Sequence, residues 1–110
     1  MDSYVHYLEG HGARVVPLIN GEPKEVTLEK LSKLNGVLFP GGEGNFVEFG
    51  QLIYSTIKEY NDNGTFYPLW STCLGYEDLV GYAASAGRNV IQPYPVYGFN
   101  LPLEFMVNPK

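Results

Sequence analysis

The sequence predicts an α/β domain in which parallel strands are joined by helical crossovers, and three observations lead to this prediction. Helix-like and strand-like segments alternate along the chain. The strand-like segments are short apolar runs of the kind that lie buried between layers. The 110 residues suffice for one hydrophobic core and are few for a complete α/β enzyme. We therefore expect residues 1–110 to form one layered domain.

The first part of the chain is predicted to alternate helix, strand, helix and strand. Apolar side chains on one helical face predict a helix over residues 4–8, and the run RVVPL at 14–18 predicts a strand. Leucines recur at a spacing of three within residues 27–34, which predicts a second helix with Thr27 as its N-cap. The apolar run GVLF at 36–39 then predicts a buried strand.

The second part of the chain continues the alternation. Asn45, with Glu48 three residues later, resembles a capping box that begins a third helix. Its apolar stripe is formed by Phe46, Phe49, Ile53, Ile57 and Tyr60. FYPLW at 66–70 predicts a strand and GYEDLVGYAAS at 75–85 a helix. The tail from 88 to 110 is rich in proline and aromatic residues, and we expect irregular chain there with room for one strand.

Cys73 is the single cysteine of the chain and lies where a predicted strand turns into a helix. Side chains at the carboxyl ends of parallel strands face the edge where α/β sheets build their sites. The N-terminus of the following helix stabilises a thiolate. The pattern Ser71-x-Cys73-x-Gly75 places small residues where a strained nucleophile elbow requires them. A buried structural cysteine is the competing interpretation.

The composition excludes several classes of partner. A formal charge of −5 argues against nucleic acid and anionic membrane surfaces. The chain holds no apolar run of transmembrane length, and the start MDSYVHYLEG lacks the regions of a signal peptide. The glycines of PGGEGN lack the lysine of phosphate-binding loops, so an ordinary strand-to-helix turn is the alternative there. We expect no nucleic-acid partner, no membrane segment, no metal and no cofactor.

Three segments, GARVVP, NGVLFPGG and WSTCLGYEDL, resemble the γ-glutamyl hydrolases. These are cysteine hydrolases of the class I glutamine amidotransferase-like superfamily that trim the γ-linked glutamate tails of folates. The resemblance runs in order over most of residues 3–80, although the family usually has glycine in place of Ser71. It implies a flavodoxin-like three-layer parallel sheet that is incomplete here, because the family's first strand and C-terminal half are missing. The chain therefore resembles an internal fragment or a truncated gene product.

The resemblance also assigns roles to individual residues. Cys73 matches the nucleophile, whose thiolate attacks the γ-glutamyl carbonyl to form an acyl-enzyme. Gly41, Gly42 and Leu74 match positions whose backbone N–H groups bind the resulting oxyanion. Glu77 stands where the superfamily often has a glutamine near the substrate, and a solvated carboxylate is the alternative.

The family's catalytic histidine, in a His-Pro-Glu-like motif, lies downstream of anything present in this chain. His6 and His11 are the only histidines, and both are expected to face solvent or end the first helix. We therefore expect the 110 residues alone to be inactive and marginally stable, with apolar faces around Phe39, Ile53 and Trp70 left exposed. The alternatives are a glutaminase subunit of a glutamine amidotransferase and a non-catalytic truncated product.

The resemblance finally implies a substrate and a location. The expected substrate is a folyl-poly-γ-glutamate, and the expected location is lysosomal, vacuolar or extracellular. The resemblance also allows a homodimer of the longer protein. Asn63 begins the only N-x-[ST] sequon and is a glycosylation candidate, with an ordinary Asn-Gly turn as the alternative.

Overall fold

The computed structural model describes residues 2–105, and its helices and strands alternate as the α/β prediction requires. The elements are α1 (Asp2–Glu9), α2 (Lys24–Lys33), β1 (Val37–Phe39), α3 (Val47–Asp62), β2 (Leu69–Ser71), α4 (Leu74–Ala83) and the 3₁₀ turn η1 (Gly87–Val90). The two strands pair in parallel, with Val37 opposite Leu69 and Phe39 opposite Ser71. Parallel pairing needs a crossover connection, which α3 supplies.

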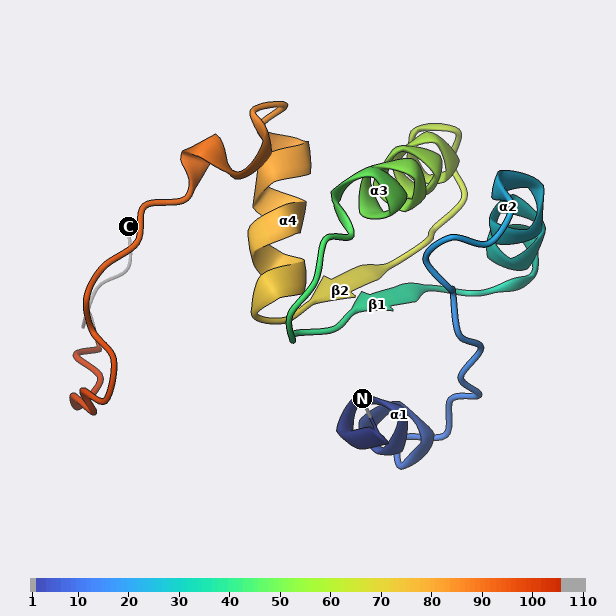
Figure 1. The fold of residues 1–110 in the computed structure, drawn as a ribbon. Coiled ribbons are helices and arrows are strands. Elements are labelled where there is room, and N and C mark those ends of the chain that lie inside the picture. The colour runs from blue at the N-terminus through green and yellow to red at the C-terminus, as the bar shows by residue number, and fades with distance from the viewer. Residues whose placement is uncertain (1, 106–110) are drawn as a thin grey trace.

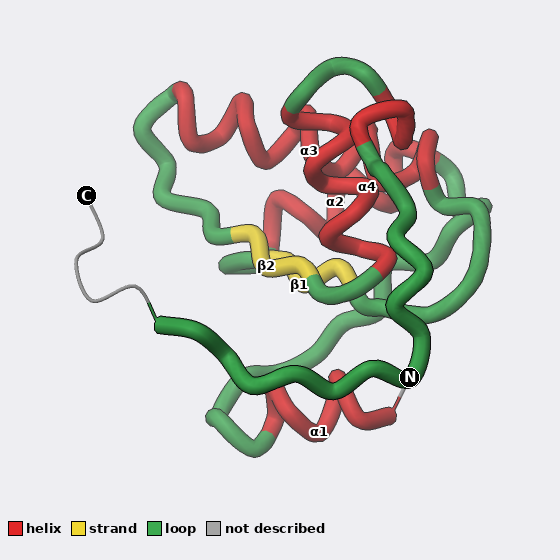
Figure 2. Tube along the Cα trace, turned by 90° about the vertical axis from the view of Figure 1, so that its left-hand side faces the viewer, coloured by secondary structure: helices red, strands yellow, loops and turns green. Residues whose placement is uncertain are grey.

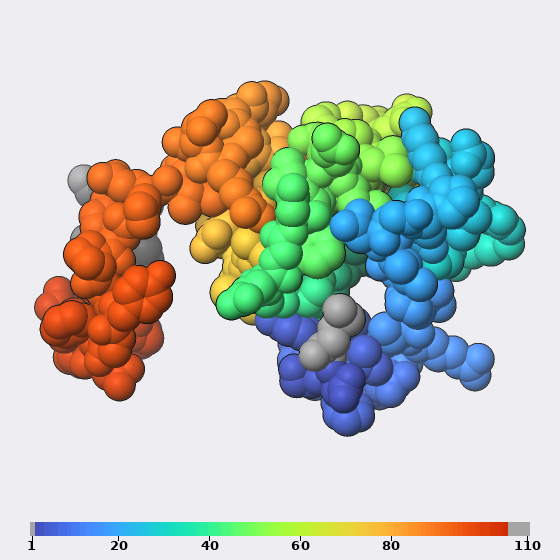
Figure 3. All heavy atoms as spheres, in the orientation of Figure 1, coloured from blue at the N-terminus to red at the C-terminus, as the bar shows by residue number. Residues whose placement is uncertain are grey.

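The described elements form three layers, and the two strands make up the middle one. Figures 1 and 2 show α2, α3 and α4 on one side of the strands and α1 on the opposite side. In the space-filling view, the segment that follows η1 lies apart from this layered body (Figure 3). None of the helices within residues 2–105 combines the length and the apolar character that a bilayer span requires.

The hydrophobic core lies between the strands and the helices of the upper layer. Its buried members are Leu31, Phe39, Ile53, Ile57, Tyr67 and Tyr82. The predicted stripe of α3 is confirmed at Ile53 and Ile57, which are buried, whereas Phe46 at the start of the helix is exposed. The expectation of exposed faces is wrong for Phe39, which Gly75 and Tyr82 of α4 pack against, and for Ile53, whose side chain lies in the buried core. It is confirmed for Trp70, which is 66% exposed.

Tyrosines in the core keep their hydroxyl groups neutral. Tyr67 Oη donates to the carbonyl of Leu31 at 3.0 Å, which ties the start of β2 to α2. Tyr82 stands edge-on to Phe39, with ring centroids 6.5 Å apart. Burial is the main reason that the pKa of Tyr82 rises to about 12. The phenols therefore act as apolar bodies with one polar tip.

The strand expected over residues 14–18 is wrong, because the chain is irregular there. Val15 and Leu18 are partly buried, so the apolar run indicates burial and not strand pairing. Pro17 has no N–H to donate to a ladder, and its carbonyl accepts a hydrogen bond from Lys30 Nζ at 3.0 Å.

Both predicted N-caps are also wrong. Thr27 lies inside α2, fully buried, and its hydroxyl donates to Glu22 Oε1 at 2.9 Å. Glu22 also pairs with Lys30, so this carboxylate organises the loop before α2. Phe46 and not Asn45 occupies the N-cap of α3, which has no side-chain cap bond. At α2, burial of Thr27 and its bond to Glu22 outweigh the capping preference.

The strand expected over residues 66–70 is shorter in the structure and begins later, because β2 runs from Leu69 to Ser71. Pro68 precedes β2, and its carbonyl accepts the first N–H of β1 at 3.0 Å. Residues 91–105 hold no strand, so within the described chain the tail is irregular apart from η1. The end of the predicted tail, 106–110, lies outside the described residues.

Asn61 connects the end of α3 to the chain that enters β2. Its Nδ2 donates to the carbonyl of Ile57 at 2.9 Å and to that of Tyr67 at 2.8 Å. Its Oδ1 accepts the N–H of Tyr67 at 3.1 Å. One side chain therefore satisfies both backbone groups of Tyr67 and fixes the direction of β2.

Replacing Asn61 with alanine should destabilise the chain by about 2 kcal/mol, because backbone groups of Tyr67 lose their partners. Urea unfolding followed by circular dichroism measures this loss. Asn63→Ala is the matched control, because Asn63 is exposed at the end of the same helix, and it should change stability little. Equal effects of the two variants would contradict the role of Asn61.

Candidate active site

Cys73 occupies the turn between β2 and α4 in a backbone conformation that few residues other than glycine adopt. Its φ is 53° and its ψ is −121°, and its side chain is exposed. Such strain costs on the order of 1–3 kcal/mol and persists only where the surroundings hold it. Thr72 N donates to Phe39 O at 3.0 Å before the turn, and Tyr76 N and Glu77 N donate to Cys73 O at 2.9 and 3.0 Å after it.

Gly75 allows α4 to pack tightly on the end of β1. A Cβ at this position would lie 2.6 Å from the carbonyl oxygen of Phe39 and 2.7 Å from its Cβ. Ser71, by contrast, is paired with Phe39 in the sheet and is half-buried. The Ser71-x-Cys73-x-Gly75 pattern therefore forms a tight strand-to-helix turn with the thiol exposed. The competing interpretation, a buried structural cysteine, is wrong.

The loop after β1 brings two glycines to this turn for different reasons. A Cβ at Gly41 would lie 2.8 Å from Cys73 Cβ and 2.8 Å from Tyr4 Oη, so Gly41 is required by space. Gly42 has open space around it, but its φ of 133° is a conformation that side-chain-bearing residues avoid. The backbone of the loop consequently packs directly on Cys73.

A cavity of about 480 Å³ lies beside the turn and brings several predicted residues together. Gly41, Gly42 and Leu74 all line it, as does Tyr4. Leu74 is the first residue of α4, and its N–H has no backbone acceptor within the described part of the chain. The glycine loop and the N-terminus of α4 therefore border one cavity next to the turn, although Cys73 itself is not among the residues that line it. Such an arrangement is suited to attack on a carbonyl.

Glu77 does not line this cavity. It lies in the first turn of α4 with its side chain exposed, and its charge acts on Arg88. Arg88 itself donates to the buried carboxylate of Asp78 at 2.7 Å, the main cause of its raised pKa. Within residues 2–105, no three histidine, cysteine, aspartate or glutamate side chains gather closely enough to bind a metal ion.

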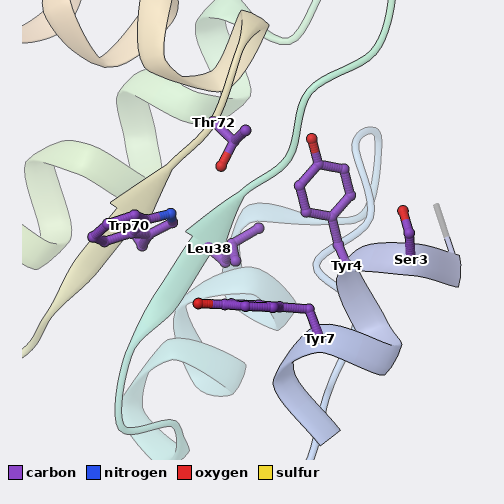
Figure 4. A pocket seen from close by; sticks show the side chains of 6 residues that line it. All are labelled: Ser3, Tyr4, Tyr7, Leu38, Trp70 and Thr72. Carbon is purple, nitrogen blue, oxygen red and sulfur yellow. The ribbon is translucent and has the colours of Figure 1, made fainter. Parts of the chain in front are cut away.

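Tyr4 is the residue of this site that sequence reasoning missed. The N–H of Gly41 donates to Tyr4 Oη at 3.0 Å, so α1 reaches from below the strands to the glycine loop. Figure 4 shows a neighbouring pocket that Tyr4 also lines, in which Tyr4 extends from α1 toward the loop after β1 and Tyr7 lies below Leu38. Trp70 and Thr72 are contributed from the second strand and its end. The available signal was a tyrosine on the apolar face of a helix, because its hydroxyl needs a partner there.

The two histidines lie on or next to α1, as the sequence predicts. His11 Nδ1 is 2.7 Å from the carbonyl oxygen of Tyr7, so this ring is engaged at the helix end. His6 is exposed on the same helix. In the part of the chain that the structure describes, neither imidazole is hydrogen-bonded to Cys73.

Replacing Cys73 with glycine should give a more stable chain than replacing it with alanine, by about 1 kcal/mol, because only glycine relieves the positive φ. Chemical denaturation of the two variants measures the difference. Val80→Gly, in the interior of α4, is the control and should lose stability instead. A Cys73→Gly chain no more stable than Cys73→Ala would show that the turn is unstrained.

Comparison with known proteins gives consistent matches over nearly the whole chain. The gamma-glutamyl hydrolase of Bos taurus is 42% identical over 110 residues, which cover 94% of this chain and 33% of that protein. Gamma-glutamyl hydrolase B of Dictyostelium discoideum is 36% identical, and the match covers 96% of this chain and 32% of that protein. Gamma-glutamyl hydrolase 1 of Arabidopsis thaliana is 37% identical, and the match covers 96% of this chain and 31% of that protein. No family model matches the chain. The chain spans about a third of the length of these relatives.

Proposed function

This chain belongs to the γ-glutamyl hydrolase family, and on that premise we propose that it carries the nucleophile of a cysteine hydrolase acting on folyl-poly-γ-glutamates. Its parallel strands and helical layers are, in this proposal, part of a class I glutamine amidotransferase-like sheet. Two layers of helices around parallel strands are consistent with that architecture.

The reaction proposed for Cys73 is acyl transfer. Its sulfur forms a bond to the γ-carbonyl carbon, and the carbonyl electron pair moves to the oxygen. When the tetrahedral intermediate collapses, the bond to the leaving amine breaks and an acyl-enzyme remains for water to hydrolyse. The N–H of Leu74 and the loop of Gly41 and Gly42 border the space where the oxyanion would form. Glu77 is retained only as a candidate for contact with the substrate's charged groups.

One observation carries this proposal: Cys73 is exposed in a strained turn with the backbone of Gly41 packed against it. A cysteine with only a packing role gains nothing from such strain, whereas a nucleophile gains exposure and nearby N–H donors. A glutaminase subunit would share this turn. The relatives in the comparison are named as gamma-glutamyl hydrolases, which favours hydrolysis of a γ-glutamyl amide.

We further propose that the 110 residues alone do not turn over a folate polyglutamate. Amide cleavage needs a group that removes the thiol proton and then protonates the leaving amine. His11 is held at the end of α1 and His6 faces solvent, so neither serves Cys73. In this proposal the proton-transfer group lies outside residues 2–105. Acylation by an activated ester, which needs no protonated leaving group, tests the nucleophile separately.

An N-benzoyl-γ-glutamyl thioester should acylate Cys73 of the purified chain, and the N-benzoyl-β-aspartyl thioester should react at least about 10-fold more slowly, since one methylene is missing. The benzoyl group stands in for the acyl group on the glutamate nitrogen of folates. Mass spectrometry of the modified cysteine peptide gives both rates.

Cys73→Ala is the control for this experiment and should acquire no acyl group, because it removes the only thiol of the chain. Equal rates with both thioesters would refute a γ-glutamyl site. Faster reaction with the γ-thioester of free glutamate, which has the same acyl group as glutamine, than with the N-benzoyl compound would favour the glutaminase alternative.

The proposed location is lysosomal, vacuolar or extracellular, and Asn63 offers a test of it. Asn63 and Thr65 are exposed in the turn between α3 and β2, so an oligosaccharyltransferase could reach the sequon. A protein containing this chain, isolated from its native host, should carry glycan on Asn63 that a peptide N-glycosidase removes. Full occupancy by unmodified asparagine in mass spectrometry would count against passage through the secretory pathway.

A further inference from the structure

We infer that the hydroxyl of Tyr4 is a direct donor to the oxyanion, so that α1 contributes a catalytic residue to the site; this inference rests on the proposed function. The starting observation is the hydrogen bond from Gly41 N–H to Tyr4 Oη at 3.0 Å. Gly41 is one of the residues expected to bind the oxyanion itself, and its N–H is already used.

The position of Tyr4 places its hydroxyl beside the nucleophile. Tyr4 Oη and Cys73 Cβ both lie 2.8 Å from the point where a Cβ of Gly41 would stand, and Cys73 Sγ lies 3.5 Å from it. The phenol oxygen and the cysteine side chain therefore both pack against Gly41, and a methyl group at Gly41 would collide with each of them. Glycine at this position allows the phenol to come this close to the nucleophile.

The hydrogen bonding of Tyr4 leaves its own proton available. The phenol oxygen accepts the N–H of Gly41, and within residues 2–105 no acceptor is found for the phenol proton. Accepting one hydrogen bond polarises a hydroxyl and strengthens the bond that it donates. The hydrogen bond from Gly41 would thus strengthen the hydrogen bond that Tyr4 donates to a substrate oxygen.

The cavity that Tyr4 lines is also lined by a second candidate donor, Leu74. Tyr4 and Leu74 both line the 480 Å³ cavity, one from α1 and one from the N-terminus of α4. A phenol and a helix N-terminal amide on two sides of one oxygen form the usual geometry of an oxyanion site. We therefore assign the Leu74 N–H and the Tyr4 O–H as the two donors to the oxyanion. The N–H of Gly41 acts indirectly, by donating to the hydroxyl of Tyr4.

Reversible binding of N-benzoyl-glutamate γ-semialdehyde tests this assignment on the 110-residue chain. The thiol of Cys73 adds to the aldehyde: the S–C bond forms, the carbonyl electron pair moves to oxygen, and the thiol proton ends on that oxygen. The hemithioacetal places its oxygen where the oxyanion would lie and needs no leaving group. Its affinity, measured by NMR with a ¹³C-labelled aldehyde carbon, reports on the donors.

Tyr4→Phe should weaken aldehyde binding about 10-fold to 100-fold, less than the 10²-fold to 10³-fold in rate typical of one oxyanion donor, because the neutral hydroxyl of the adduct accepts a weaker hydrogen bond than an oxyanion does. Tyr7→Phe is the matched control: it lies on the same helix without a bond to the glycine loop, and its affinity should equal that of the unmodified chain. The rate of Cys73 alkylation by iodoacetamide should be the same in all three chains.

Unchanged aldehyde affinity in Tyr4→Phe would overturn the role of Tyr4 and leave the proposed function standing. A parallel loss of aldehyde affinity and iodoacetamide rate, or loss of the helical circular dichroism signal, would assign Tyr4 a structural role and also overturn the inference. An unmodified chain that forms no aldehyde adduct would contradict both the inference and the proposed function.

Discussion

The positive φ of Cys73 is the constraint on which the rest of the site depends. A residue with a side chain holds this conformation only if both flanking elements are fixed. On one side, β2 is fixed by pairing with β1, and on the other, α4 is fixed by the contact of Gly75 with Phe39. The free energy of packing these elements therefore maintains the strain, and the strain keeps the thiol exposed beside the glycine loop.

The same packing explains why the site lies at one edge of the sheet. The parallel strands end together, so the loop after β1 and the turn after β2 meet, and Gly41 contacts Cys73. Asn61 acts at the opposite end of β2, where its hydrogen bonds to Tyr67 fix the direction in which the chain enters the sheet. α1 closes the edge from below through Tyr4.

Local patterns in the sequence predicted the features that depend on local chemistry. The stripe of α3, the strand at β1 and the turn at Cys73 follow from periodicity and from small residues at fixed spacing. The strand expected over 14–18 failed because pairing needs a partner strand, which no local pattern supplies. Thr27 failed as a cap because its hydroxyl found Glu22 instead. The contact of Tyr4 with Gly41 joins residues 37 positions apart, beyond any spacing rule.

The central claim is that Cys73 is a nucleophile. When its sulfur attacks a carbonyl, the carbonyl oxygen is proposed to accept hydrogen bonds from Leu74 N–H and Tyr4 O–H. A crystal structure of the chain with the bound γ-semialdehyde tests this most directly. The account predicts continuous density from Sγ to the aldehyde carbon, with the oxygen within hydrogen-bond distance of Leu74 N and Tyr4 Oη, and a positive φ retained at Cys73. An adduct whose oxygen faces solvent, or a Cys73 with negative φ, would contradict it.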